Sequence, residues 1–172
     1  MSVYDHSAHV AEQTYRKLLR KDLRDGAIAG ILAGGVLLVL FFAYDLVYFR
    51  PLATPDFLSS AFFGGGEPGE ETIARLRSAR IGAFTVLHLV TFTFVGVLLA
   101  RFFRFTQLRK TFLTGALYGL IVCTAVFSAG LQVTGAEMSV APPWPPLLGG
   151  NFATGLVMVM FLRRVQGVGP SG

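Results

Sequence analysis

The chain alternates between long apolar blocks and short polar segments that carry nearly all of its charge. The blocks are about 20 residues long, the length that an α-helix needs to cross ~30 Å of hydrocarbon. The fourth block is the shortest, and it crosses only if residues 144–146 enter the interface. The pattern therefore predicts an all-α fold, an integral membrane four-helix bundle in one domain (residues 26–164), with spans at about residues 26–49, 81–100, 111–133 and 145–162.

A polar segment at residues 1–25 precedes the first span. Val10, Thr14 and Leu18 recur in it at helical spacing, with charged residues on the other faces. This spacing predicts a short amphipathic helix that lies on the membrane surface. A solvated positive tether that only sets the orientation of the first span is the alternative. After the last span, the glycine-rich residues 165–172 are predicted to form a flexible tail.

The connection between the first two spans contains two prolines. Pro51 ends the first helix, because the residue before a proline avoids the α conformation. Thr54 has the residue type of a helix N-cap, and Pro55 fits the first helical position after it. A short interfacial helix is therefore predicted at residues 55–63, as a lid or brace. A further helix is predicted to begin at Glu70 and to run without a break into the second span.

The loop before the last span contains Pro142, Pro143, Pro145 and Pro146, interrupted by Trp144. A run of prolines cannot be helical throughout, so this segment is predicted to be extended. Its tryptophan is a natural anchor at the membrane interface, where aromatic residues with a polar edge are enriched. The end of the first span carries two further aromatic anchors of this kind, Tyr44 and Tyr48.

The charges set the expected orientation of the bundle. The sequence has 15 Lys and Arg against 10 Asp and Glu, and 11 of the 15 cations lie in residues 1–25, 101–110 and 163–164. Cations at the ends of apolar blocks follow the positive-inside rule, which places both termini in the cytoplasm. The same clustering explains the net charge of +5 without a nucleic-acid partner.

Glycines recur at four-residue spacing on several predicted spans. Such small residues let a neighbouring helix backbone approach closely. The neighbour is either another helix of the bundle or a helix of another subunit. The expected partners are therefore the lipid bilayer and other membrane protein subunits that pack on the glycine faces, which are formed by Gly26, Gly30, Gly34, Gly115, Gly119 and Gly150.

Asp45 is the only carboxylate within the predicted spans, and it lies toward the glycine face of the first one. His88 is expected at a similar depth in the second span, so a proton-sharing or ligand-coordinating pair is one interpretation. The alternative is a hydrogen-bonded lock between helices, an ion pair with Arg50 or Arg80, or a helix cap. Other polar residues are expected in the same layer, namely Asn151, Ser128 and Gln132.

No catalytic motif accompanies these polar residues. The three histidines and the single cysteine, Cys123, have no metal-ligand spacing, and we find no phosphate-binding glycine loop or nucleophile elbow. A single intramembrane histidine cannot supply a bis-histidine haem site. We therefore expect no catalytic residue, no metal and no cofactor, and we do not expect an enzyme.

Asp45-Leu46, Arg50-Pro51-Leu52 and Thr54-Pro55 form a pattern that resembles small, uncharacterised bacterial four-span membrane proteins. In that group an Asp-Leu pair, Arg-Pro-Leu, a Thr-Pro step and a short apolar helix likewise follow one another at the end of the first span. A histidine early in the second span, as at His88, is also similar. The resemblance covers about residues 26–100. It implies a bacterial inner-membrane location and a shared Asp45 region, and it brings no activity.

Two functions of different classes fit these observations. The first is a structural or accessory subunit of a larger bacterial inner-membrane complex, of the respiratory or photosynthetic kind, with no chemistry of its own. Four spans, glycine faces, little soluble mass and the lack of a catalytic motif favour it. The second is an oligomeric transporter, channel or proton-linked carrier component that uses an intramembrane pair formed by Asp45 and His88. A membrane enzyme or cofactor binder is the least favoured class.

Overall fold

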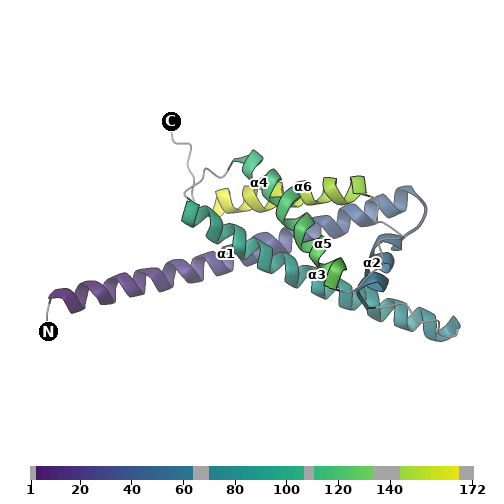
Figure 1. Cartoon of the computed structure of the whole chain (residues 1–172), viewed down its shortest axis with the longest axis horizontal. Coiled ribbons are helices and arrows are strands. Elements are labelled where there is room, and N and C mark those ends of the chain that lie inside the picture. Colours follow the sequence, from purple (N-terminus) through teal and green to yellow (C-terminus); the bar gives the residue numbers. More distant parts are fainter. Residues whose placement is uncertain (1–2, 64–69, 107–110, 134–143, 167–172) are drawn as a thin grey trace.

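The computed structural model describes residues 3–63, 70–106, 111–133 and 144–166 (Figure 1). The described residues are almost entirely helical and contain no strand. Four helical segments, at residues 12–47, 76–106, 112–130 and 145–165, are long and apolar enough to cross a membrane. The predicted all-α bundle is confirmed, and the chain is a multi-pass membrane protein. Its elements are α1 (Val3–Val47), α2 (Ala53–Phe63), α3 (Glu70–Thr106), α4 (Phe112–Tyr118), the π-helical turn η1 (Gly119–Cys123), α5 (Thr124–Val133) and α6 (Trp144–Val165).

The first helix is much longer than a membrane span. It has 45 residues and is roughly 70 Å long at 1.5 Å per residue. The N-terminal segment is helical, as predicted, but it is not a separate helix, because α1 continues through Gly26 without a break. An ion pair between Arg16 and Glu12, one turn apart at 2.6 Å, supports the helix there. Figure 1 shows this end of α1 projecting beyond the rest of the bundle.

Two glycine contacts bring the long helices together. Where α1 meets α3, a Cβ on Gly30 would lie 2.1 Å from the carbonyl oxygen of Phe92, and one on Gly96 would lie 2.3 Å from that of Gly26. Where α6 meets α4 and η1, a Cβ on Gly155 would lie 2.0 Å from the carbonyl oxygen of Gly115. These distances leave no room for a side chain, so the backbones themselves are in contact.

The predicted glycine faces are therefore occupied within the chain. A Cβ on Gly34 would meet Phe92 at 3.1 Å, one on Gly119 would meet the Asn151 carbonyl oxygen at 2.2 Å, and one on Gly150 would meet the Leu37 side chain at 2.3 Å. Packing within the bundle, one of the two alternatives, accounts for all six glycines. These contacts give no support to the prediction that other subunits pack on the same faces.

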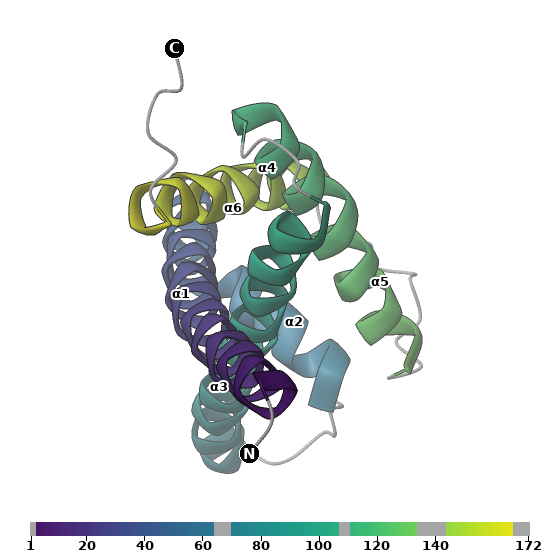
Figure 2. The same ribbon diagram turned by 90° about the vertical axis from the view of Figure 1, so that its left-hand side faces the viewer.

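The hydrophobic core follows from the two glycine contacts. Because α1 packs against α3 and α6, and α6 packs against α4 and η1, apolar side chains from all of these helices meet. Figure 2, in which the N-terminal end of α1 faces the viewer, shows α5 lying apart from α1. The core includes the fully buried residues Ala29, Ala33, Leu99, Met158, Val159 and Leu162.

The buried face of α1 extends past the predicted start of the first span. Asp22 and Asp25 precede that start, yet their exposed fractions are only 3% and 1%. The Arg104 guanidinium of α3 donates a hydrogen bond to the Asp22 carboxylate, and Arg24 donates to Asp25. Asp45 is therefore not the only buried carboxylate of this helix. Sequence reasoning missed the other two because they lie among cations and were assigned to the polar segment.

The last helix begins earlier than predicted. Trp144, Pro145 and Pro146 form the first turn of α6, so they are not extended. Proline is compatible with this position, because the first backbone N–H groups of a helix have no intrahelical acceptor. The rest of the predicted extended segment, at residues 142–143, lies outside the described residues, as do the Trp144 side chain and residues 167–172 of the predicted tail. The first residue of that tail, Val165, is the last residue of α6.

The third span also differs in one detail from a single α-helix. It runs from Phe112 to Val133 but includes the π-helical turn η1, which begins at Gly119. This turn coincides with the close approach of Gly119 to α6. The short helix predicted at residues 55–63 is present as α2, which begins two residues earlier, and the continuous helix into the second span is present as α3.

The glycine contact between α1 and α3 makes a testable prediction. Gly30→Ala places a methyl group against the Phe92 carbonyl, so the two helices must separate, and the free energy of unfolding should fall by about 1–3 kcal/mol. The measurement is unfolding of the purified protein by SDS in mixed micelles.

Gly35→Ala on the same helix is the matched control, because a Cβ there meets nothing within 4 Å. Alanine favours a helix over glycine by up to ~1 kcal/mol, so this variant should be neutral or slightly more stable. Equal effects of the two substitutions would show that close packing at Gly30 is unimportant.

Candidate functional site

The end of α1 has a defined capping structure. The Phe49 N–H donates to the Leu46 carbonyl at 3.1 Å, and the Arg50 N–H donates to the Asp45 carbonyl at 2.9 Å. This pair of bonds is the Schellman motif, which requires a left-handed residue at the position of Phe49. The φ angle of Phe49 is 53°, in agreement. Glycine is the usual residue here, so a phenylalanine in this conformation is strained.

A second tight turn follows at once. The Ala53 N–H donates to the Arg50 carbonyl at 3.0 Å, with Pro51 and Leu52 between them. Leu52 has a φ angle of 66°. Proline followed by a residue with positive φ is the pattern of a type II turn, in which the second of these residues is usually glycine. Two bulky residues within four positions therefore adopt left-handed conformations, each at a cost of about 1–2 kcal/mol.

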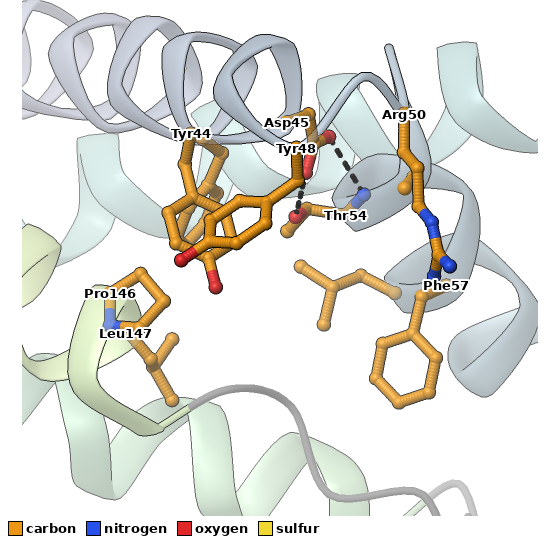
Figure 3. Close-up of a pocket in the computed structure, with 11 residues that line it drawn as sticks. Tyr44, Asp45, Tyr48, Arg50, Thr54, Phe57, Pro146 and Leu147 are labelled. Atoms are coloured by element: carbon orange, nitrogen blue, oxygen red, sulfur yellow. Dashed lines mark hydrogen bonds between the residues drawn. The ribbon is translucent and has the colours of Figure 1, made fainter.

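Asp45 joins the two sides of this double turn (Figure 3). The Thr54 backbone N–H donates to Oδ2 of Asp45 at 2.8 Å, and the Thr54 hydroxyl donates to Oδ1 at 2.6 Å. The exposed fraction of Asp45 is only 3%. Hydrogen bonds to an ionised acceptor are shorter and stronger than neutral ones, so both interactions hold α2 against the end of α1.

The carboxylate of Asp45 performs the role of an N-cap for α2. Thr54 is the second residue of that helix, and a negative charge beside a helix N-terminus is favourable. The Asp56 N–H donates to the Leu52 carbonyl at 3.0 Å, so Leu52 precedes the helix and Ala53 begins it. The prediction that Thr54 is itself the N-cap and Pro55 the first helical residue is wrong. Of the roles considered for Asp45, the helix cap and the hydrogen-bonded lock between helices are both observed.

Asp45 and His88 do not form a pair. The Nε2 atom of His88 lies 3.3 Å from the Gly34 carbonyl oxygen, so this histidine contacts the backbone of α1 about three turns from Asp45. Its ring lies between those of Phe84 and Phe92, with centroids 5.9 Å and 4.6 Å away. These two side chains therefore cannot share a proton directly.

The remaining predicted polar residues separate in the same way. The Asn151 amide donates to the Thr124 hydroxyl at 2.9 Å and is buried, so it links α6 to α5. Ser128 and Gln132 lie on α5 and line neither of the two cavities described below. The residues predicted to form one polar layer therefore lie in two separate places. Asp45 lies in one of them, and His88 and Asn151 lie in the other.

Two adjoining cavities occupy these places. The first has a volume of about 480 Å³, and its polar lining comes from the double turn and the end of α1. The second has a volume of about 260 Å³, and its lining is mainly apolar and rich in phenylalanine, with His88, Thr91 and Asn151 as polar groups. Phe41, Leu58 and Leu147 line both cavities. The polar groups of the first cavity are Tyr44, Asp45, Tyr48, Arg50 and Thr54.

Sequence reasoning placed Asp45 correctly in the interior but missed its partner. The partner is Thr54, nine residues further along the chain. A signal was present, since Pro51 favours a turn and Thr54 offers two donors, its N–H and its hydroxyl. The contribution of Pro146 and Leu147 from α6 to the first cavity had no signal, because no sequence pattern links residues 100 positions apart.

The predicted aromatic anchors have different environments. Tyr44 is half-buried and Tyr48 is exposed, with ring centroids 4.7 Å apart, and both line the first cavity. Among the described residues, no group of three His, Cys, Asp or Glu side chains is arranged to hold a metal ion. The chain matches none of the protein families, curated proteins or solved structures with which it was compared.

The strained turn gives a second testable prediction. Phe49→Gly removes the left-handed strain at a residue whose exposed fraction is 92%, so little packing is lost. The free energy of unfolding should rise by about 1 kcal/mol. SDS unfolding in mixed micelles measures the change.

Val47→Gly is the control, because Val47 is also exposed but, as the last residue of α1, does not have a positive φ angle. Glycine at this position should lower stability by up to about 1 kcal/mol. The strain assignment fails if Phe49→Gly destabilises the protein as much as Val47→Gly does.

Proposed function

We propose that this chain is a structural or accessory subunit of a larger bacterial inner-membrane complex, with both termini in the cytoplasm. The observation that carries the proposal is the N-terminal part of α1, which continues beyond the bundle. We call residues 9–21 the stalk. Its described side chains are exposed, apart from the half-buried Leu19. An isolated helix of this length is marginal in water, so a contact outside this chain would stabilise it.

The stalk has two distinct sides. Tyr15 and Leu18 lie on the same side of α1 as the buried residues Asp22, Asp25 and Ala29, because they precede them at three- and four-residue steps. The exposed fraction is 58% for Tyr15 and 41% for Leu18. The side that α3 and α6 cover in the bundle therefore continues onto the stalk as an uncovered apolar strip. This strip fits a helix of another subunit.

The cations of the stalk lie on the other side. Arg16, Lys17, Arg20 and Lys21 fall, together with Arg24 just after the stalk, within about 140° of one another around the helix. This arrangement supports a cytoplasmic position, where cations near a span face anionic headgroups. The apolar strip is then free for a protein contact while the basic side stays near lipid or water.

The ionisable groups inside the bundle also favour a structural role. Asp45 caps α2, Asp22 bonds to Arg104, and His88 contacts the Gly34 carbonyl. The contacts of Asp22 and His88 join parts of the chain that are far apart in sequence. The separation of Asp45 from His88 removes the support for a proton-linked carrier that uses them as a pair.

The subunit proposal predicts a particle larger than the chain alone. After mild detergent extraction from native membranes, the protein should migrate well above 18.6 kDa plus a micelle, together with at least one different membrane protein identified by mass spectrometry. Migration as a monomer, or as an oligomer of this chain only, contradicts the proposal.

Tyr15→Glu tests the stalk itself, because it places a charge in the apolar strip and should release the partner. Gln13→Glu introduces the same charge on the basic side of the same exposed helix and should leave the complex intact. Retention of the partner by both variants would remove the stalk from the proposal.

A further inference from the structure

We infer that the first cavity binds the headgroup of a zwitterionic phospholipid of the phosphoethanolamine class, and that the second cavity receives part of an acyl chain. This inference goes beyond the subunit proposal and does not depend on it. It rests on the charges of the first cavity, on the position of its two tyrosines and on the apolar lining of the adjoining cavity. Its volume of about 480 Å³ lies within the ~300–1,000 Å³ range of ligand sites.

The first cavity carries one negative and one positive group at different places on its wall. Asp45 accepts two hydrogen bonds from Thr54, but a carboxylate has about four lone-pair sites, so its oxygens retain acceptor capacity. Arg50 lines the same cavity and is exposed. In Figure 3 the Arg50 side chain extends beside Phe57, on the opposite side of the cavity from Tyr44 and Tyr48. A ligand with a single charge would be attracted by one of these groups and repelled by the other.

The tyrosines define where a cation would lie. Tyr44 and Tyr48 lie side by side, with centroids 4.7 Å apart and planes inclined by 48°, next to Asp45 (Figure 3). Aromatic faces attract ammonium groups, and an adjacent carboxylate adds to that attraction. The ammonium of the headgroup therefore belongs near Asp45 and the tyrosine rings.

The phosphate belongs near Arg50. Guanidinium groups bind phosphate oxygens through planar, two-point hydrogen bonds. Arg50 follows the end of α1, at the level where a span meets the headgroup region. The two charges of the cavity thus match, in sign, the two charges of a phosphoethanolamine headgroup.

The second cavity can hold the apolar part of the lipid. Phe41, Leu58 and Leu147 separate the first cavity from the second and line both. The second cavity lies further along the bundle, in the direction of His88, and its walls are mainly phenylalanine, leucine and valine. An acyl chain that leaves the headgroup would enter this apolar space rather than water.

The decisive experiment compares two lipids on the intact protein. The full-length chain, purified and stripped of lipid, is mixed with equal amounts of phosphatidylethanolamine and phosphatidylglycerol with identical acyl chains, and bound lipid is counted by native mass spectrometry. We expect phosphatidylethanolamine to be retained about tenfold better, since phosphatidylglycerol lacks the ammonium. Equal retention, preference for phosphatidylglycerol or retention of neither lipid overturns the inference.

Two variants test the location of the site. Arg50→Gln removes the phosphate contact and Tyr48→Leu removes an aromatic face, and each should lower retention of phosphatidylethanolamine severalfold. The matched controls are Arg101→Gln and Phe94→Leu on α3, which line neither cavity and should retain the lipid as the wild type does. If Arg50→Gln and Tyr48→Leu also retain it fully, the lipid does not bind at this cavity.

Discussion

The two hydrogen bonds from Thr54 to the Asp45 carboxylate fix the direction in which the chain leaves its first span. They hold α2 against the end of α1, and α2 in turn packs on α3. The backbone between the two residues adopts two left-handed conformations, at Phe49 and Leu52, which are unfavourable by themselves. The carboxylate thus stabilises a turn that the local sequence would not adopt alone. The cavity beside Asp45 has its shape because this turn is fixed.

The glycine contacts act at a larger scale than this turn. They set the distance between α1 and α3 and between α6 and the third span, because a side chain at these positions would meet backbone atoms. Once these helices are in contact, their polar groups are positioned by the packing. Asp22 meets Arg104, and His88 meets the Gly34 carbonyl. Buried polar groups therefore join helices here, as polar contacts between membrane spans commonly do.

The four spans were predictable because each depends on a local run of apolar residues, and α2 was predictable from its flanking prolines. The continuity of α1 was not, since a cluster of cations suggests an interfacial segment whether or not the helix continues. The burial of Asp22 and Asp25 depends on α3 and α6, which contact α1 from distant parts of the sequence. Among the residues that line the first cavity, the sequence predicted a functional site only at Asp45. Its pairing with Thr54 had a local signal in Pro51 and the two Thr54 donors, whereas the contribution of Leu147 arises from tertiary packing that no local pattern encodes.

The most direct test of this account is a double-mutant cycle between Asp45→Asn and Thr54→Val, measured by unfolding in mixed SDS micelles. If the carboxylate caps α2 through Thr54, each single change should destabilise the protein, and the second should cost much less once the first is present. The coupling free energy should then be about 1–2 kcal/mol, as expected for a hydrogen bond to a charged group. Effects that add to within about 0.3 kcal/mol would contradict the central role of this interaction.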